Sequence, residues 1–159
     1  MYPQKQSITV TEALKKMEHY CAYQERCHKE VAQKMQTWNL IPEAKEKILL
    51  HLMQENYLNE ERFARSFARG KFRIKKWGKQ RIVKELKFKQ ISDFNIKTAL
   101  KEISEQEYTQ TFYELVDRFV ERNQSLEPSK LKTKLISYLQ YRGWESSLIF
   151  ETVNNLELR

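Results

Sequence analysis

The chain has 159 residues, and only three of them are glycine and three proline, so long irregular loops are not expected. Charged residues make up 31% and hydrophobic residues 40%, which is typical of a helix-rich chain with narrow buried faces. Because no apolar run approaches the roughly 18 residues of a membrane span and the N-terminus is unlike a signal peptide, we expect a cytoplasmic protein without a membrane partner.

The first third of the chain predicts three helices. Thr9, followed three residues later by Glu12, forms a capping box that opens a helix over residues 9–24. A second helix is expected over residues 25–37. A third begins at Pro42, whose missing N–H does no harm in a first turn, and ends near Tyr57.

The positive charge is concentrated in the middle of the chain. Residues 60–89 hold twelve Lys or Arg against three Glu, whereas the remainder holds seventeen basic against eighteen acidic residues. The formal net charge of +8 therefore comes from one patch and is not a general property of the chain.

Helical periodicity places this patch on an outer face. Over residues 60–76, one stripe is predicted to be buried, and it comprises Phe63, Phe67, Gly70, Ile74 and Trp77. A basic stripe lies nearly opposite, with Phe72 beside it, and comprises Arg62, Arg65, Arg69, Arg73 and Lys76. After Gly78 a further helix is predicted to bury Ile82, Val83 and Leu86 and to expose Arg81, Lys84 and Phe88.

Two interpretations of the basic faces compete. A charge run on a helix is often only a solvated face. Here few acidic residues lie three or four positions away, so the like charges repel one another, and that cost favours an anionic partner. The nearby rings could stack on bases, so a nucleic acid is the expected partner.

A repeat organises the whole chain. If Leu40, Ile91 and Trp144 are equivalent, four further positions of each copy are also apolar, at offsets of 51 and 53 residues between copies. These positions are Val31, Ile82 and Leu135; Met35, Leu86 and Leu139; Leu49, Leu100 and Val153; and Leu52, Ile103 and Leu156. Such a period indicates stacked supersecondary units. We predict an all-α fold of three tandem three-helix modules, at residues 9–56, 57–104 and 105–157, that form an elongated array.

The turn inside each module supports this alignment. We call Leu40, Ile91 and Trp144 the anchors of the three copies. The residue before each anchor is Asn39, Gln90 and Gly143, respectively. Asn and Gly tolerate the left-handed conformation that closes a helix, whereas Gln90 fits that role poorly. In the third module, Ser104 and Glu107 are expected to cap a helix over 105–123, and Pro128 begins the next helix.

No catalytic pattern is present in the sequence. There is no glycine-rich phosphate loop, nucleophile elbow or H-E-x-x-H motif. The adjacent Glu60 and Glu61 diverge on a helix and are interpreted as favourable helix-start charges. Cys21, Cys27 and the neighbouring histidines fit packing better than zinc binding. We therefore expect no enzyme, no metal and no cofactor.

Three stretches carry a resemblance to a known family. YLNEERFARSFARGKF at 57–72, WGKQRIVKELK at 77–87 and RGW at 142–144 resemble motifs of the RecX family of bacterial recombinase regulators. The matching positions are Arg62, Phe63, Arg65, Phe67, Arg69, Lys71, Gly78, Arg81, Glu85, Leu86, Arg142, Gly143 and Trp144. The resemblance implies an extended, curved array of three-helix repeats.

The resemblance also implies a function in recombination, DNA repair and the SOS response. A family member is expected to bind the groove of the RecA–single-stranded DNA filament and to inhibit filament extension, ATP hydrolysis and strand exchange. The expected partners are the RecA filament and single-stranded DNA, with double-stranded DNA as a second option, and the chain is expected to be a monomer. Candidate DNA- or filament-binding residues are Arg62, Arg65, Arg69, Lys71, Arg73, Lys75, Lys76, Lys79, Arg81 and Lys84.

The alternative is a DNA-binding protein of the helix-turn-helix type that acts without RecA. Each joint between a second and a third helix resembles that turn. However, the third helices begin at residues 42–44, 92–94 and 145–147, which are neutral or acidic, and this counts against reading a major groove.

Overall fold

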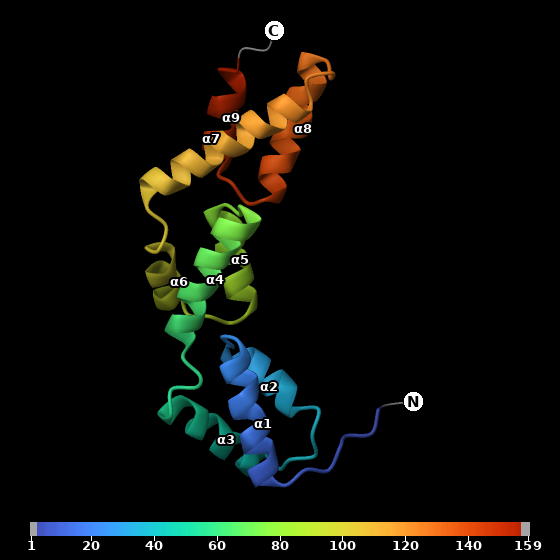
Figure 1. Cartoon of the computed structure of the whole chain (residues 1–159), viewed down its shortest axis with the longest axis vertical. Helices are drawn as coiled ribbons and strands as arrows, with labels where there is room; N and C mark the ends of the chain where they lie inside the picture. Colours follow the sequence, from blue (N-terminus) through green and yellow to red (C-terminus); the bar gives the residue numbers. More distant parts are fainter. Residues whose placement is uncertain (1–2, 157–159) are drawn as a thin grey trace.

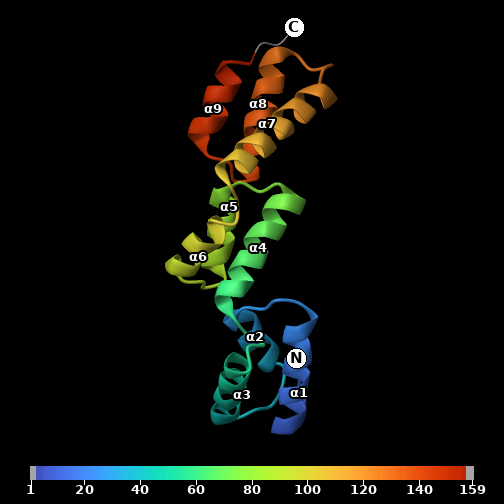
Figure 2. The same ribbon diagram turned by 60° about the vertical axis from the view of Figure 1, so that its left-hand side comes forward.

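The computed structural model describes residues 3–156. Within this range the chain forms nine helices and one isolated β-bridge, and no strand. The helices are α1 (Val10–Tyr23), α2 (His28–Met35), α3 (Pro42–Gln54), α4 (Glu60–Lys75), α5 (Lys79–Phe88), α6 (Asp93–Leu100), α7 (Glu105–Arg122), α8 (Pro128–Tyr141) and α9 (Ser146–Asn154). Three groups of three helices follow one another along the long axis (Figures 1 and 2), so the predicted all-α, elongated and curved array is confirmed.

The repeat positions form the inner faces of the helices. None of the fifteen apolar positions of the repeat is exposed, and the six that precede the anchors by nine or five residues are all buried. The helix starts at Thr9, Ser104 and Pro128 also agree with the prediction, since the Thr9 and Ser104 hydroxyls accept hydrogen bonds from the Glu12 and Glu107 amides at 3.1 Å. The module limits 9–56, 57–104 and 105–157 stay a prediction.

Two hydrophobic cores run through the array. The first is built by α1, α2 and α3 around Met17, Ile48 and Leu52. The second is shared by α4 to α9, and Trp144 lies inside it, stacked on Tyr108 with ring centroids 4.4 Å apart. Among the described residues before α4, Cys27 alone belongs to the buried part of the second core, so α4 to α9 form one continuous packed unit.

The phase predicted for α4 was partly wrong. Phe72, predicted to lie beside the basic stripe, is only 1% exposed, whereas Ile74, predicted to be buried, is 78% exposed. The inner face is formed by Phe63, Ala64, Ala68 and Phe72, and the two alanines allow α4 to pack closely on α6. Phe72 is fixed by long-range contacts with the rings of Tyr108 and Trp144, which the helix period alone does not reveal.

Helix ends differ from expectation at three places. α2 begins at His28, three residues late, because Cys27 is the N-cap and its N–H donates to the Glu30 carboxylate at 3.2 Å. Gly143 has the predicted left-handed backbone, and Gln90 adopts it too with φ 63°. Asn39 does not; its N–H instead donates to the Gln6 carbonyl at 2.9 Å.

Candidate nucleic-acid interface

Five of the ten candidate cations have carboxylate partners among the described residues. Arg62 pairs with Glu25 at 2.6 Å, and Lys79 with Glu105 at 2.9 Å. The others are Arg65 with Glu61 and Glu102, Arg69 with Glu102, and Arg73 with Glu107, at 2.9 to 3.7 Å. The expectation that these cations have few acidic partners was therefore wrong, because most of the acids come from distant segments of the chain.

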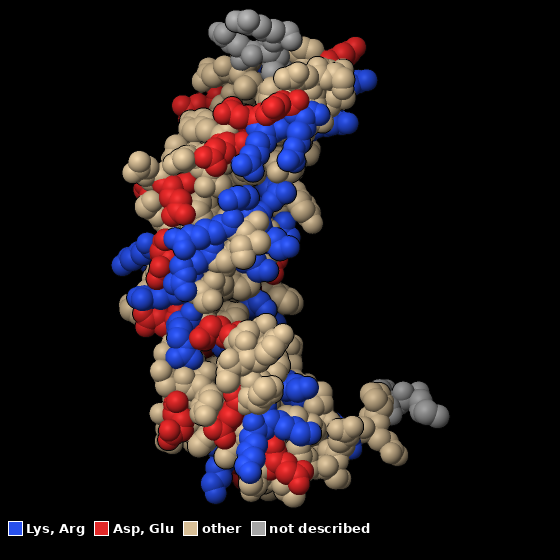
Figure 3. All heavy atoms as spheres, in the orientation of Figure 1, with Lys and Arg blue, Asp and Glu red and all other residues tan. Residues whose placement is uncertain are grey.

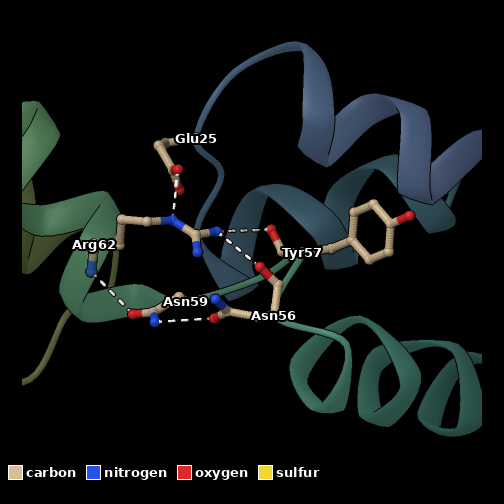
Figure 4. Close-up of polar contacts among 5 residues, drawn as sticks. All are labelled: Glu25, Asn56, Tyr57, Asn59 and Arg62. Carbon is tan, nitrogen blue, oxygen red and sulfur yellow. Dashed lines mark hydrogen bonds and ion pairs between the residues drawn. The ribbon is translucent and has the colours of Figure 1, made fainter.

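Arg62 holds the first module to the second (Figure 4). Its Nε donates to Glu25, and its guanidinium also donates to the carbonyl oxygens of Asn56 and Tyr57 at 3.0 and 3.2 Å. Its backbone N–H donates to the Asn59 side chain, which caps α4. Since one side chain ties the loop before α2 and the loop before α4, the role of Arg62 here is structural.

The Glu60 carboxylate adds to the same joint. It accepts from the backbone N–H of His28 at 3.0 Å, at the start of α2, while it also lies in the first turn of α4. Glu60 thus stands near two helix N-termini, where a negative charge is favoured. This agrees with its interpretation as a helix-start charge.

A second group of cations is surrounded by rings. The Lys71 Nζ lies 5.0 Å from the centre of the Trp77 ring, and the Arg81 guanidinium lies 4.1 Å from Trp77 and 4.7 Å from Tyr141. The Arg142 guanidinium lies 4.6 Å from the Tyr138 ring. We call Lys71, Trp77, Arg81, Tyr138, Tyr141 and Arg142 the cation–ring strip. In the described part of the chain no carboxylate lies within ion-pair distance of its cations.

The strip runs from α4 across α5 to α8, and further lysines flank it. Lys75 and Lys84 are exposed and Lys76 is half-buried, also without a carboxylate partner among the described residues. Tyr141 is 76% exposed, so one face of its ring is open to a partner. Figure 3 shows Lys and Arg gathered over the middle of the molecule, with Asp and Glu close beside them.

Two glycines lock the strip in place. The Gly78 N–H donates to the Arg142 carbonyl at 2.8 Å, and the Gln80 N–H donates to the Gly143 carbonyl at 3.1 Å. A Cβ on Gly78 would lie 2.4 Å from the Gly143 oxygen, and a Cβ on Gly143 would lie 2.2 Å from the Arg81 Cβ. Only glycine permits this contact between the start of α5 and the turn before α9.

Tyr108 and Trp144 complete this joint. The Tyr108 hydroxyl accepts from the Lys79 N–H at 2.9 Å and donates to the Glu145 carboxylate at 2.7 Å. Burial, together with the bond to Glu145, raises the pKa of Tyr108, so its hydroxyl stays protonated and keeps donating. The Trp144 indole N–H donates to the Lys76 carbonyl at 3.2 Å. The strip therefore spans two modules that are held rigidly together.

Sequence reasoning missed the ring partners of the strip. Tyr141 lies 60 residues from Arg81, and only the contact between the end of α8 and the start of α5 joins them. The ring of Tyr138 instead pairs with nearby Arg142, which was not among the ten candidates. Trp77 was assigned to a buried stripe but is half-buried, with cations on its ring. The R-G-W motif at 142–144 was the one signal that pointed to this region.

Neither a metal site nor a membrane span is found in the described part of the chain. Residues 3–156 contain no group of three or more His, Cys, Asp or Glu arranged to hold a metal ion. Burial raises the pKa of the Cys21 thiol to about 11, so it is a poor ligand or nucleophile at neutral pH. None of the helices over these residues is long and apolar enough to cross a membrane.

These features define an all-α protein built from tandem three-helix repeats that present an extended surface. Residues 59–100 match the family model of the second three-helix domain of RecX, and residues 105–153 match that of the third. The chain belongs to the RecX family.

Named relatives and solved structures agree with this family. The chain is 27% identical over 154 residues to the regulatory protein RecX of Lactobacillus johnsonii, covering 97% of this chain and 57% of the relative. It is 24% identical over 138 residues to that of Bacillus subtilis, covering 87% and 52%. The chain thus spans about half the length of the curated relatives it matches.

The fold is shared with two crystal structures. One is of regulatory protein RecX, with a TM-score of 0.80 and 21% identity, covering 92% of this chain and 73% of that one. The other is of RecX from Lactobacillus salivarius, with a TM-score of 0.79 and 20% identity, covering 94% and 97%.

Proposed function

We propose that this chain regulates the RecA recombinase by binding the RecA–single-stranded DNA filament, as membership of the RecX family suggests. The observation that carries the proposal is the cation–ring strip, in which cations without carboxylate partners among residues 3–156 alternate with aromatic rings over two modules. Cations that neutralise phosphates and rings that stack on bases are the elements of single-strand binding.

The ten candidate residues differ in what they offer to DNA. Lys71, Lys75, Lys76, Arg81 and Lys84 present charge without a competing carboxylate in the described chain. Arg65, Arg69 and Arg73 would exchange partly exposed carboxylates for phosphates. Such surface pairs contribute at most about 1 kcal/mol, so the exchange is feasible. Arg62 and Lys79 serve mainly the joints between modules.

The mechanism we propose is steric and electrostatic. The joint between α5 and α9 makes the second and third modules one stiff arm, because two glycines, Tyr108 and Trp144 fix it. An arm of this kind lying in the filament groove would span neighbouring RecA protomers and occupy the path of incoming DNA. Filament extension, ATP hydrolysis and strand exchange would then be inhibited without any chemistry by the chain itself.

ATP hydrolysis by RecA on single-stranded DNA tests the proposal. We expect inhibition by substoichiometric amounts of the chain. We expect weaker inhibition by the variant Lys71→Gln/Lys75→Gln/Lys84→Gln, which neutralises one lysine of the strip and two that flank it and is called the strip triple variant. The control triple Lys130→Gln/Lys132→Gln/Lys134→Gln removes the same charge from the first half of α8, from lysines that do not belong to the strip, and should inhibit normally. Inhibition that disappears when DNA is in excess would instead indicate simple competition for DNA.

A further inference from the structure

A second basic surface lies in the first module. The N-terminal segment at residues 3–6 is pinned beside the turn after α2, where Gln6 and Trp38 form a β-bridge and the Asn39 N–H donates to the Gln6 carbonyl. Between this segment, α1 and the second half of α2 is a groove of about 1100 Å³. Figure 1 shows the segment running past the ends of α1 and α2. We call this the first-module groove.

Cations and rings alternate along this groove. The Arg26 guanidinium lies 3.7 Å from the centre of the Tyr20 ring, and the Lys34 Nζ lies 5.9 Å from both Tyr20 and Trp38. Lys16 stands over the Trp38 ring as well, also at 5.9 Å. Tyr23, at the end of α1, lines the groove and is 77% exposed.

The groove lining contains no carboxylate from the described residues. Five cations line it, namely Lys5, Lys15, Lys16, Arg26 and Lys34, and no Asp or Glu does. Three acids of α1 and the segment after it have other partners: Glu18 lies 3.9 Å from His51, Glu25 pairs with Arg62, and Glu30 accepts from the Cys27 N–H. Outside residues 60–89 the basic and acidic residues nearly balance in the sequence, but the fold places these cations on the groove and the acids elsewhere. The patch in the middle of the chain is therefore not the only basic surface.

The chemistry and size of the groove select a class of ligand. Its volume of about 1100 Å³ lies at the upper end of the roughly 300–1,000 Å³ of typical small-molecule pockets, so it has room for a polymer segment. Positive charge without carboxylates suits a phosphodiester backbone, and an exposed tyrosine beside it offers a face to an unpaired base. An acidic peptide could pair with the cations, but its carboxylates would not stack on the rings.

We propose that the first-module groove is a second binding site for single-stranded nucleic acid, separate from the cation–ring strip. This goes beyond the proposed function, since it requires neither RecA nor the second and third modules for contact. A strand held in the groove would engage one end of the array while the strip engages the middle.

Fluorescence anisotropy of a short labelled oligothymidine, without RecA, tests this site in the full chain. The strip triple variant serves as background to lower the binding through the strip, and the part of the remaining binding that is lost with the groove cations reports on the groove. We expect adding Lys15→Gln/Lys16→Gln/Lys34→Gln to weaken that binding at least about tenfold, and to reduce its salt slope by about two, as three lost phosphate contacts would. Adding Tyr23→Ser should weaken binding at constant salt slope, because it removes a ring and no charge.

The control adds Lys130→Gln/Lys132→Gln/Lys134→Gln to the same background, with melting temperatures measured for every variant. The proposal would be overturned if the groove variant lost no more affinity for oligothymidine than the control does. Equal affinity for a duplex of the same length would also overturn it. Competition by oligoglutamate as effective as by unlabelled oligothymidine would also overturn it, in favour of an acidic protein partner. Because RecA is absent, these outcomes are distinct from failure of the RecA proposal.

Discussion

Gly143 shows how one residue can fix a joint between modules. Its φ is 88°, and a Cβ added there would lie only 2.2 Å from the Arg81 Cβ, so there is no room for a side chain. We expect Gly143→Ala to lower the free energy of unfolding by more than about 2 kcal/mol, from left-handed strain and backbone overlap. Urea unfolding followed by circular dichroism measures this.

Gly70 supplies the matched control for that substitution. It lies within α4, and nothing stands within 4 Å of an added Cβ. Gly70→Ala should therefore stabilise the chain by about 0.5–1 kcal/mol, since alanine is the better helix former. If both substitutions had the same small effect, the close contact between α5 and the turn before α9 would be refuted.

Substitutions at Phe72 and Ile74 test which face of α4 is buried, because the structure buries Phe72 whereas the sequence pattern predicted that Ile74 is buried. Phe72→Ala should cost about 3–5 kcal/mol through a cavity in the shared core, whereas Ile74→Ala should change stability by less than about 0.5 kcal/mol. The reverse order, measured by thermal unfolding, would restore the phase expected from periodicity. Periodicity weighted the large aromatic residues and overlooked Ala64 and Ala68, which mark the true inner face.

At the scale of the element, most helices could be predicted from caps and apolar spacing. Thr9, Ser104 and Pro128 mark helix starts where local rules act within a few residues. Local rules did not predict the left-handed backbone of two further residues. Lys76 ends α4, and Asn56 lies in the turn after α3. They also could not pair Arg65 and Arg69 with Glu102, because that contact depends on α4 packing against α6.

The joint before α4 depends on one cation. Arg62→Ala would leave Glu25 without its partner and free two carbonyl oxygens of the loop after α3. We expect a loss of about 1–2 kcal/mol and a looser first module, because this joint is mainly polar. Arg62→Lys should recover little, since an ammonium cannot reproduce the guanidinium fork. Small-angle X-ray scattering should show a wider distribution of lengths; an unchanged profile would contradict this role.

At the scale of the whole molecule, the repeat predicted an elongated array but not its unequal joints. None of the fifteen apolar positions that align the three copies is exposed. That the second and third modules share a core follows from Trp144, Tyr108 and Phe72 meeting across them, a long-range contact with no signature in the repeat. The first module keeps its own core.

Separate cores predict unequal stability along the chain. Hydrogen exchange of the backbone amides should show α1, α2 and α3 opening at a lower free energy than α4 to α9, since the larger core binds six helices together. Mass spectrometry of peptides from each region resolves this. Identical opening free energies in all nine helices of the described chain would show one cooperative unit instead.

Co-sedimentation with preassembled RecA–single-stranded DNA filaments measures directly whether the cation–ring strip binds the filament. We expect the chain and the control triple variant Lys130→Gln/Lys132→Gln/Lys134→Gln to sediment with the filament. The strip triple variant Lys71→Gln/Lys75→Gln/Lys84→Gln, at an unchanged melting temperature, should bind at least about tenfold more weakly. Equal sedimentation of both variants would contradict a filament contact through the cation–ring strip.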